Sequence, residues 1–390
     1  MNQQSLTVNR YQLRAIRTDR TKQLGNGFDL PVLGLIGEIG SLLSEVKKKQ
    51  RDSRSYLGYE TSVVEEMGDA LWYLAVIADH GELPLATIAA SAQGDGQEPM
   101  FDGEDIELLS LQPQPPLPLH APTAAFERTL LQLAGAVGRL AEMSAQGGLP
   151  ADRAGLLAHL ASIFRFLLTA ANEAGITLHQ AATHNLKKAA DRWPEDRNFS
   201  TDFDQDFPIE EQLPKTLKIE IFERTAKNGK TYVVQKCNGL FIGDRLTDNI
   251  MKPDDYRFHD AFHYAYAAIL GWSPVTRALF RLKRKSETQV DEGQDGARAI
   301  LIEEGVATYV FGEAKQLDFL EGQGAGDLGF TFLKSVRQFV RGYESEDCPL
   351  WLWEEAILKG NEAFRFLKTH RRGRLILDRP NRSLLVESLP

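Results

Sequence analysis

Acidic side chains stand within two otherwise apolar stretches, and this pattern constrains the chain more than any other feature. The stretches are GLIGEIGSLLSEVKKKQRD at 34–52 and VVEEMGDALWYLAVIADH at 63–80. Apolar residues recur in both with a period of 3.6, which predicts two amphipathic helices. A carboxylate on an apolar helix face costs several kcal/mol unless it is neutralised. The acids therefore either face solvent or hold a cation; they are Glu38, Glu45, Glu66 and Asp69.

The spacing of these acids favours a shared site. Glu66 and Asp69 are three residues apart and project from one helix face, and Glu38 and Glu45 are two turns apart and also share a face. Two antiparallel helices can therefore direct three or four carboxylates at a common point. Such hard oxygen ligands suit Mg²⁺, or Mn²⁺ as a substitute. The alternative stays open, because acidic pairs on a solvated helix surface are common.

Neighbouring residues fit a site for a polyphosphate. Lys47 and Lys48 follow the acidic face and are expected to contact phosphate oxygens. Trp72 lies about one turn beyond the second acidic pair and is a candidate stacking surface for a base. Three glycines lower the helix propensity and are expected to clear space beside the carboxylates: Gly37, Gly40 and Gly68.

The two stretches together resemble the MazG family of all-α nucleotide pyrophosphohydrolases. That family carries E-x-x-E on one helix and E-x-x-D on the next. Glu38 matches the first glutamate, and Glu66 and Asp69 match E-x-x-D. Ser41 occupies the position of the second glutamate, which is a departure. Either Ser41 contributes its hydroxyl, Glu45 substitutes from one turn further on, or the metal site is weakened.

The resemblance extends to NLKKAADRW at 185–193, which is similar to the family's closing N-x-x-K helix. It implies that Asn185 and Lys188 contact substrate, and we expect Arg192 to contact phosphate as well. It also implies cleavage of a nucleoside triphosphate between the α and β phosphates with Mg²⁺, which gives a monophosphate and pyrophosphate. Such enzymes work as homo-oligomers. A nucleotide-binding sensor with weak turnover, coupled to the C-terminal domain, is the alternative that Ser41 favours.

The chain is expected to be mainly α, with an N-terminal helical bundle and a mostly helical C-terminal domain. The bundle covers 1–194 and contains a linker or loop insertion rich in Gly and Pro at 93–122. An acidic linker follows at 195–214. The domain at 215–390 begins with alternating residues around Asn228-Gly229, which predict a small antiparallel hairpin sheet.

Residues 123–194 are a candidate degenerate second copy of the first helix pair. The apolar pattern of 63–85 recurs at 156–178, although few residues are identical. At the positions equivalent to the metal-binding carboxylates stand Ala136, His159 and Ser162. A duplication would have kept the packing and lost the acids. The alternative is that two amphipathic helix pairs simply look alike.

A second metal site is predicted in the C-terminal domain. His259 and His263 are four residues apart, a spacing that lets two imidazoles on one helix share a transition metal. Glu304, next to Glu303 in a later helix, can complete the site. The alternative is a buried polar network in which Arg257 or Arg298 pairs with the acids. The resemblance does not indicate which activity this domain has.

Bulk properties exclude several classes of protein. The 390-residue chain has a formal net charge of -9, which argues against general nucleic-acid binding. Its first 22 residues are polar, so we expect no signal peptide, and because no uncharged apolar stretch approaches about 18 residues we expect no membrane span. The expected partners are nucleoside triphosphates, without a membrane, and the expected compartment is the cytoplasm.

Overall fold

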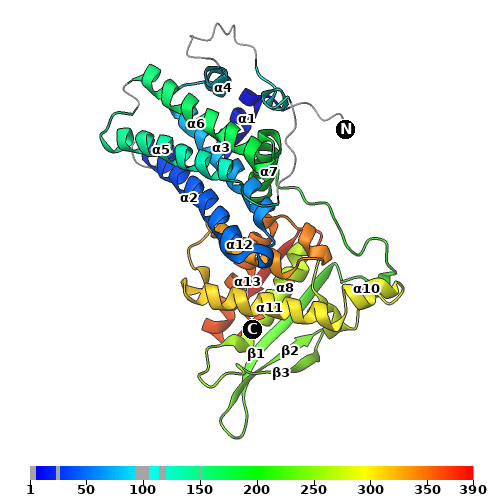
Figure 1. The fold of residues 1–390 in the computed structure, drawn as a ribbon. Helices are drawn as coiled ribbons and strands as arrows, with labels where there is room; N and C mark the ends of the chain where they lie inside the picture. The colour runs from blue at the N-terminus through cyan, green and yellow to red at the C-terminus, as the bar shows by residue number, and fades with distance from the viewer. Residues whose placement is uncertain (1–5, 23–26, 94–104, 114–119, 150–151, 390) are drawn as a thin grey trace. The chain divides into compact units, whose positions relative to one another are not determined.

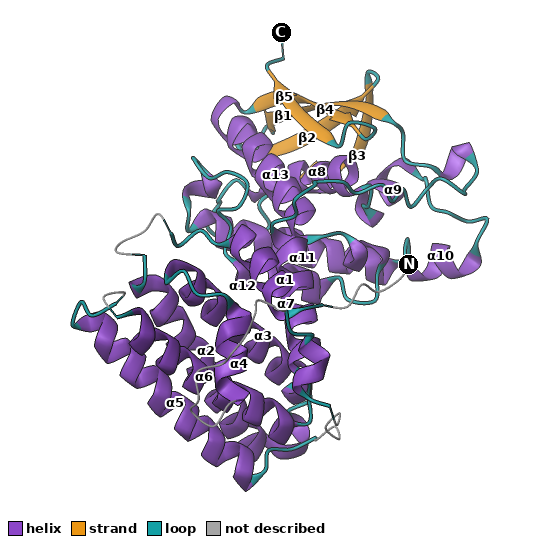
Figure 2. Cartoon of the chain, turned by 90° about the horizontal axis from the view of Figure 1, so that it is seen from above, coloured by secondary structure: helices purple, strands orange, loops and turns teal. Residues whose placement is uncertain are grey.

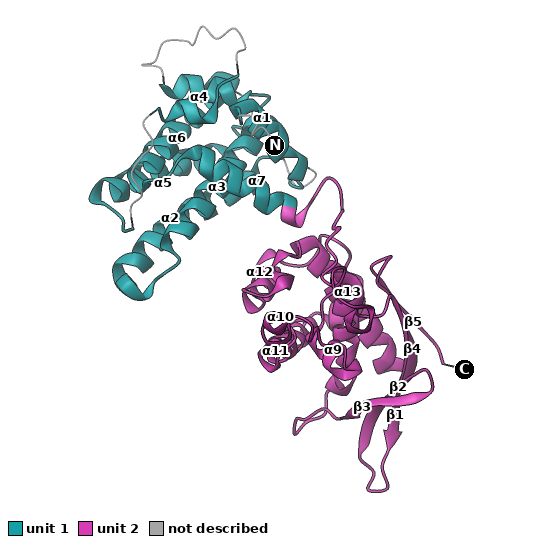
Figure 3. Ribbon diagram, turned by 90° about the vertical axis from the view of Figure 1, so that its right-hand side faces the viewer, with its two compact units in different colours: residues 1–190 teal, residues 191–390 magenta. Residues whose placement is uncertain are grey.

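The computed structural model describes residues 6–22, 27–93, 105–113, 120–149 and 152–389. The chain forms two compact units, residues 1–190 and 191–390, which are distinguished in Figure 3. The predicted fold class is confirmed, because the protein is mainly α and its sheet is small and antiparallel. Each unit is described by itself below.

Unit 1 is a helical bundle. The long helices α2 and α3 pack against each other, α5 packs against α2, and α6 packs against α5, as Figure 1 shows. The bounds are α1 Val8–Ala15, η1 Ile16–Thr18, α2 Asp29–Asp52, η2 Ser53–Ser55, α3 Tyr59–His80, α4 Leu85–Gln93, η3 Leu108–Leu111, α5 Ala124–Ala145, α6 Arg153–Ala174 and α7 Leu178–Arg192.

Helix α6 is apolar because it crosses the core of this bundle. By length and composition alone it is long and apolar enough to cross a membrane, contrary to the expectation from the sequence. Its Leu156, Leu160, Phe164 and Leu167 are buried in the hydrophobic core of unit 1. This burial accounts for part of the hydropathy of α6, since 44% of its apolar stretch is buried.

The described part of 93–122 packs onto unit 1. Residues 94–104 and 114–119 lie outside the described residues. Between them, Leu108 and Leu111 are buried in the core, and the backbone N–H of Leu108 donates to the carbonyl of Leu6 at 3.0 Å. The side chain of Gln112 accepts from the N–H of Leu178 at 2.7 Å. This part of the expected linker or loop insertion is therefore an ordered part of the bundle.

The candidate second copy, α5 and α6, forms a helix pair within the same bundle as α2 and α3. Ala136, at the position equivalent to Glu38, is only 2% exposed and belongs to the core. A carboxylate there would be buried in the hydrophobic core, which is costly. The duplication itself stays a prediction.

Unit 2 combines helices with a five-stranded antiparallel sheet in the order β3-β2-β1-β4-β5. Figure 2 shows α8 and α13 against this sheet, and both helices contact β4 and β5. The strands are β1 Thr216–Thr225, β2 Thr231–Cys237, β3 Leu240–Leu246, β4 Arg372–Asp378 and β5 Ser383–Glu387. The helices are η4 Ile209–Glu211, η5 Tyr256–Phe258, α8 Asp260–Ala265, η6 Tyr266–Leu270, α9 Pro274–Phe280, α10 Thr288–Gly293, α11 Ala297–Lys315, η7 Asp318–Leu320, α12 Phe330–Phe339, η8 Glu344–Asp347 and α13 Leu350–His370.

The predicted hairpin joins β1 to β2. Gly229 has a φ of +78°, a conformation that glycine adopts without steric cost, and Ile219 lies opposite Cys237 in the register. Alternate residues Ile219 and Ile221 of β1 are buried, as the period-2 pattern requires.

The acidic stretch 195–214 contributes to the interior of unit 2. Asp204 is buried and forms an ion pair with the buried guanidinium of Arg277. The other carboxylate oxygen of Asp204 accepts from the N–H of Leu213 at 2.8 Å, and the side chain of Leu213 lies in the core. At Asp204, the acidic character of this segment therefore serves packing against a basic group rather than solvation of a free linker.

Candidate active site

Three of the four predicted carboxylates converge in unit 1. Glu38 extends from α2, and Glu66 and Asp69 extend from α3. One carboxylate oxygen from each side chain lies within 4.8 Å of the other two. All three side chains are half-buried, so they belong neither to the dry core nor to a fully solvated helix surface.

The crowding of like charges changes how these acids ionise. Burial, a hydrogen bond with Glu66 and the charges of Asp69 and Glu66 raise the pKa of Glu38 from 4.5 to about 8. Burial also raises the pKa of Glu66. Three adjacent carboxylates therefore do not all ionise at neutral pH without a positive charge among them.

Helix α7 supplies the polar partners of Asp69. The Nδ2 atom of Asn185 donates to Oδ1 of Asp69 at 2.9 Å, and the hydroxyl of Tyr11 donates to Oδ1 of Asn185 at 3.1 Å. The ammonium of Lys188 forms ion pairs with Asp69 and, at 2.8 Å, with Oε1 of Glu65. Burial lowers the pKa of Lys188, but these two carboxylates more than offset it, so the pKa is raised and the lysine is charged.

Gly68 allows α7 to approach α3 this closely. A Cβ atom at this position would lie 2.6 Å from the carbonyl oxygen of Ala181 and 3.0 Å from Cβ of Asn185. At Gly37 and Gly40 an added Cβ would meet no described atom within 4 Å. Gly68 is therefore needed for the approach of α7, whereas the expectation that Gly37 and Gly40 clear space beside the carboxylates stays a prediction.

Glu45 does not join the carboxylate group. It is buried, at 4% exposure, and accepts hydrogen bonds from the hydroxyl of Tyr56 and, at 2.6 Å, from Nζ of Lys48. Lys48 is thus engaged by Glu45, whereas Lys47 is exposed to solvent. Ser41 is half-buried on α2. Glu45 has the surroundings of a structural ion pair and not of a fourth metal ligand.

Trp72 and Arg192 are also engaged elsewhere. The indole N–H of Trp72 donates to the carbonyl of Ala15 at 3.0 Å and so ties α3 to the end of α1. Arg192 belongs to unit 2, where its buried guanidinium forms an ion pair with the carboxylate of Glu354 on α13.

Two residues at the site carry no local signal in the sequence. Glu65 belongs to the site only through its ion pair with Lys188, which lies more than 100 positions later in the chain. Tyr11 reaches Asn185 across 174 positions, and burial raises the pKa of its phenol well above the usual value. Only the packing of α1 and α7 against α3 reveals either residue.

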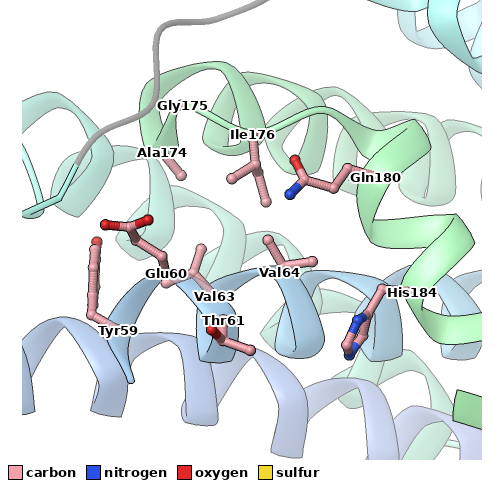
Figure 4. Close-up of a pocket in the computed structure, with 10 residues that line it drawn as sticks. All are labelled: Tyr59, Glu60, Thr61, Val63, Val64, Ala174, Gly175, Ile176, Gln180 and His184. Carbon is pink, nitrogen blue, oxygen red and sulfur yellow. The ribbon is translucent and has the colours of Figure 1, made fainter. Parts of the chain in front are cut away.

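A cavity of about 390 Å³ lies beside α3 and α7 (Figure 4). Val64 of α3 and His184 of α7 point toward it, together with Ile176 from the turn before α7. The remaining lining residues are Tyr59, Glu60, Thr61, Val63, Ala174, Gly175 and Gln180. The lining of this cavity includes none of the three converging carboxylates.

The predicted residues of unit 2 also lie together. Ligand atoms of His259, Asp260 and His263 lie within 4.8 Å of one another. Oε2 of Glu304 lies 3.7 Å from Nε2 of His259 and 3.4 Å from Nε2 of His263. Asp260 was not singled out as a ligand by the spacing of the histidines alone.

Comparison with known proteins gives one family match. Residues 198–390 match the family model described as MazG C-terminal domain. The match supports the MazG family in general, and with it an enzyme of the nucleotide pyrophosphohydrolase kind in general. It covers the C-terminal part of the chain, whereas the motif resemblance rests on the N-terminal half.

One curated relative is the gene 37 protein of Mycobacterium phage L5. It is 33% identical over 64 residues, which are 16% of this chain and 56% of that protein. The chain thus matches little more than half the length of this relative. No solved structure matches the chain.

Proposed function

We propose that unit 1 is a Mg²⁺-dependent nucleoside triphosphate pyrophosphohydrolase, which converts an NTP or dNTP to the monophosphate and pyrophosphate. The observation that supports this most is the convergence of Glu38, Glu66 and Asp69 from two helices. The family match of residues 198–390 supports the same general kind of enzyme.

The donor set fits a hard divalent cation. Three carboxylate oxygens lie within 4.8 Å of one another, and Mg²⁺ is bound through carboxylates, waters and substrate phosphates. Burial and the neighbouring carboxylates raise the pKa of Glu38, and a bound divalent cation would offset this crowding of negative charge. Glu38, Glu66 and Asp69 would hold the ion, and Mn²⁺ would suit the same oxygens. When bound, the ion would supply charge neutralisation for the phosphates and a more acidic water.

The side chains around the ion have distinct roles in this proposal. Asn185 holds Asp69 in place through its amide, and Tyr11 in turn orients that amide. Lys188 lies beside Asp69 and is the cation best placed to exchange its carboxylate partners for phosphate oxygens. Lys47, which is exposed, is assigned an outer contact to the phosphate chain.

The test is a panel of all NTPs and dNTPs with Mg²⁺, with the products separated by ion-exchange chromatography. Monophosphate plus pyrophosphate is the expected result, and Glu66→Gln and Asp69→Asn are expected to lower the rate at least about 100-fold, about 3 kcal/mol in the barrier. Glu142→Gln, at an exposed glutamate of α5, is the matched control and should keep the rate. Release of diphosphate and orthophosphate would contradict the proposal.

A nucleotide sensor is the second candidate. Two observations favour it: Ser41 stands where a second glutamate is expected, and Lys188 already neutralises part of the acidic group through Asp69. Calorimetric titration with nucleotide separates the candidates, because a sensor binds without releasing pyrophosphate.

A further inference from the structure

We propose that unit 2 binds one divalent first-row transition ion through Nε2 of His259, Nε2 of His263 and the carboxylates of Asp260 and Glu304. Asp260 and His263 lie in α8, His259 immediately precedes this helix, and Glu304 lies in α11. This site is separate from the carboxylate group of unit 1 and differs from it in its nitrogen donors.

The distances between the candidate ligand atoms suit a shared ion. Nε2 of His259 lies 3.2 Å from Oδ1 of Asp260 and 3.7 Å from Oε2 of Glu304. The same Glu304 oxygen lies 3.4 Å from Nε2 of His263. Ligands about 2.1 Å from a tetrahedral ion are separated by about 3.4 Å. His259, Asp260 and His263 therefore already lie together as candidate ligands, and Glu304 lies at ligand spacing from both imidazoles.

The hydrogen bonds of the two imidazoles determine which nitrogen is available. Nδ1 of His259 lies 2.9 Å from the carbonyl oxygen of Tyr256, and Nδ1 of His263 lies 2.8 Å from Oε1 of Glu303. Both acceptors require a proton on Nδ1, so the lone pair of each neutral ring is on Nε2. Metal-binding histidines are characteristically oriented by a carbonyl or carboxylate in this way.

The acidic ligands are oriented as well. Oδ2 of Asp260 accepts a hydrogen bond from the side-chain amide of Gln235, which itself accepts from the hydroxyl of Tyr264. This leaves Oδ1 of Asp260 directed toward His259. Outer groups therefore hold both histidines and the aspartate in ligand positions.

Nε2 of His263 is buried, and the nearby Glu304 carboxylate does not give it a well-formed hydrogen bond. The side chain of His263 is 1% exposed, and no residue in the described part of the chain makes a hydrogen bond to this nitrogen. A buried polar atom without a partner is uncommon and costly. It faces Glu304 at 3.4 Å, on the side where the other ligands converge.

The alternative of an arginine-paired network does not account for the site. Arg257 is engaged by Glu223, Asp248 and Asp255, and Arg298 is exposed.

Imidazole and carboxylate donors together suit zinc, iron, manganese or cobalt. The side chain of Glu304 is 38% exposed, so the ion would be accessible from solvent. An accessible coordination position is the arrangement of a catalytic rather than a closed structural site.

The test uses the full chain, stripped with a chelator and titrated separately with Zn²⁺, Mn²⁺, Co²⁺ and, without oxygen, Fe²⁺. Bound metal is measured by mass spectrometry after gel filtration, and bound Co²⁺ by its visible absorption. One ion per chain is expected for at least one of these metals. His259→Ala and His263→Ala should abolish stoichiometric binding, and Glu303→Gln should weaken it about 10–100-fold because it loosens His263.

Controls separate the site from general effects of losing a charge or a histidine. His370→Ala removes an exposed histidine of the same unit, and Glu66→Gln alters only the carboxylate group of unit 1. Both should keep the ion. Glu304→Gln changes a partly exposed side chain, so circular dichroism should show an intact fold while affinity falls.

Two results would overturn the site. One is wild-type protein that binds none of the four ions at stoichiometric level, and the other is unchanged occupancy in both histidine variants. Because no nucleotide is present, neither result depends on whether unit 1 turns over its substrate.

Discussion

Glu38→Gln is expected to stabilise unit 1 when divalent cations are absent and the pH is about 8.5. In the folded chain the Glu38 carboxyl keeps its proton up to a pKa of about 8, compared with an ordinary value of 4.5. Between these two values the folded state binds more protons than the unfolded state. The free energy of unfolding therefore falls as the pH rises through this range, and glutamine, which does not ionise, escapes the loss.

The magnitude follows from the same pKa values. A rise from 4.5 to about 8 corresponds to about 5 kcal/mol at most, at about 1.4 kcal/mol for each pKa unit. Glu38 is only half-buried, and solvent screening reduces this to about 1–2 kcal/mol. For a domain the size of unit 1, that difference raises the unfolding midpoint by about 2–8 °C.

The assay is differential scanning calorimetry of the full chain with a chelator, at about pH 5 and about pH 8.5. The variant should exceed wild type only at the higher pH, and added Mg²⁺ should raise the midpoint of wild type far more than that of the variant. Glu142→Gln removes the same charge from an exposed position of unit 1 and should show no such pH dependence. Equal midpoints for wild type and Glu38→Gln at pH 8.5 would refute the electrostatic crowding described for the site.

Four further substitutions test the internal packing of unit 1 and the internal packing of unit 2. Gly68→Ala should destabilise unit 1 by about 1–3 kcal/mol in chemical denaturation, because the new Cβ meets the backbone of α7. Gly37→Ala places its Cβ in open space and should be neutral or stabilising by up to about 1 kcal/mol. Equal effects of the two substitutions would contradict the packing described. Arg192→Met leaves Glu354 without its buried partner and should lower the free energy of unfolding of unit 2 by about 3–5 kcal/mol, while the KM for nucleotide stays the same. A raised KM with unchanged stability would instead make Arg192 a phosphate contact. Lys188→Met should lower the metal-free stability of unit 1 by about 1–3 kcal/mol, measured by the same calorimetry, and an unchanged midpoint would show that its ion pairs contribute nothing.

The helices were predictable because their signals are local. A period of 3.6 marks α2 and α3, and Asn228-Gly229 with period-2 alternation marks the hairpin of β1 and β2. The role of Asp204 was not predictable, because its buried partner Arg277 lies 73 positions later in the chain. A run of acids looks solvated until the packing shows which one is paired.

In the candidate site, too, the local spacing of residues was predictable and their distant partners were not. The i,i+3 spacing of Glu66 and Asp69 placed them on one face, and the meeting with Glu38 needs only that α2 and α3 pack together. Glu45 was misassigned because two full turns of helix give the same face but a different level, where Tyr56 and Lys48 take its oxygens. Helical periodicity therefore predicts well which face of a helix a side chain projects from, but poorly which neighbours it meets along the helix axis.

The distance in sequence between Asp69 and Lys188 has a consequence for how the chain is made. The carboxylates of α2 and α3 leave the ribosome long before Lys188, which follows Asp69 by 119 residues. Until α7 emerges, this pair of helices carries its acids without their ammonium partner. Any fragment that ends before α7 would inherit the same imbalance. The shortest piece of this protein in which Asp69 has its ammonium partner must therefore extend through Lys188, although the acids themselves are complete by residue 69.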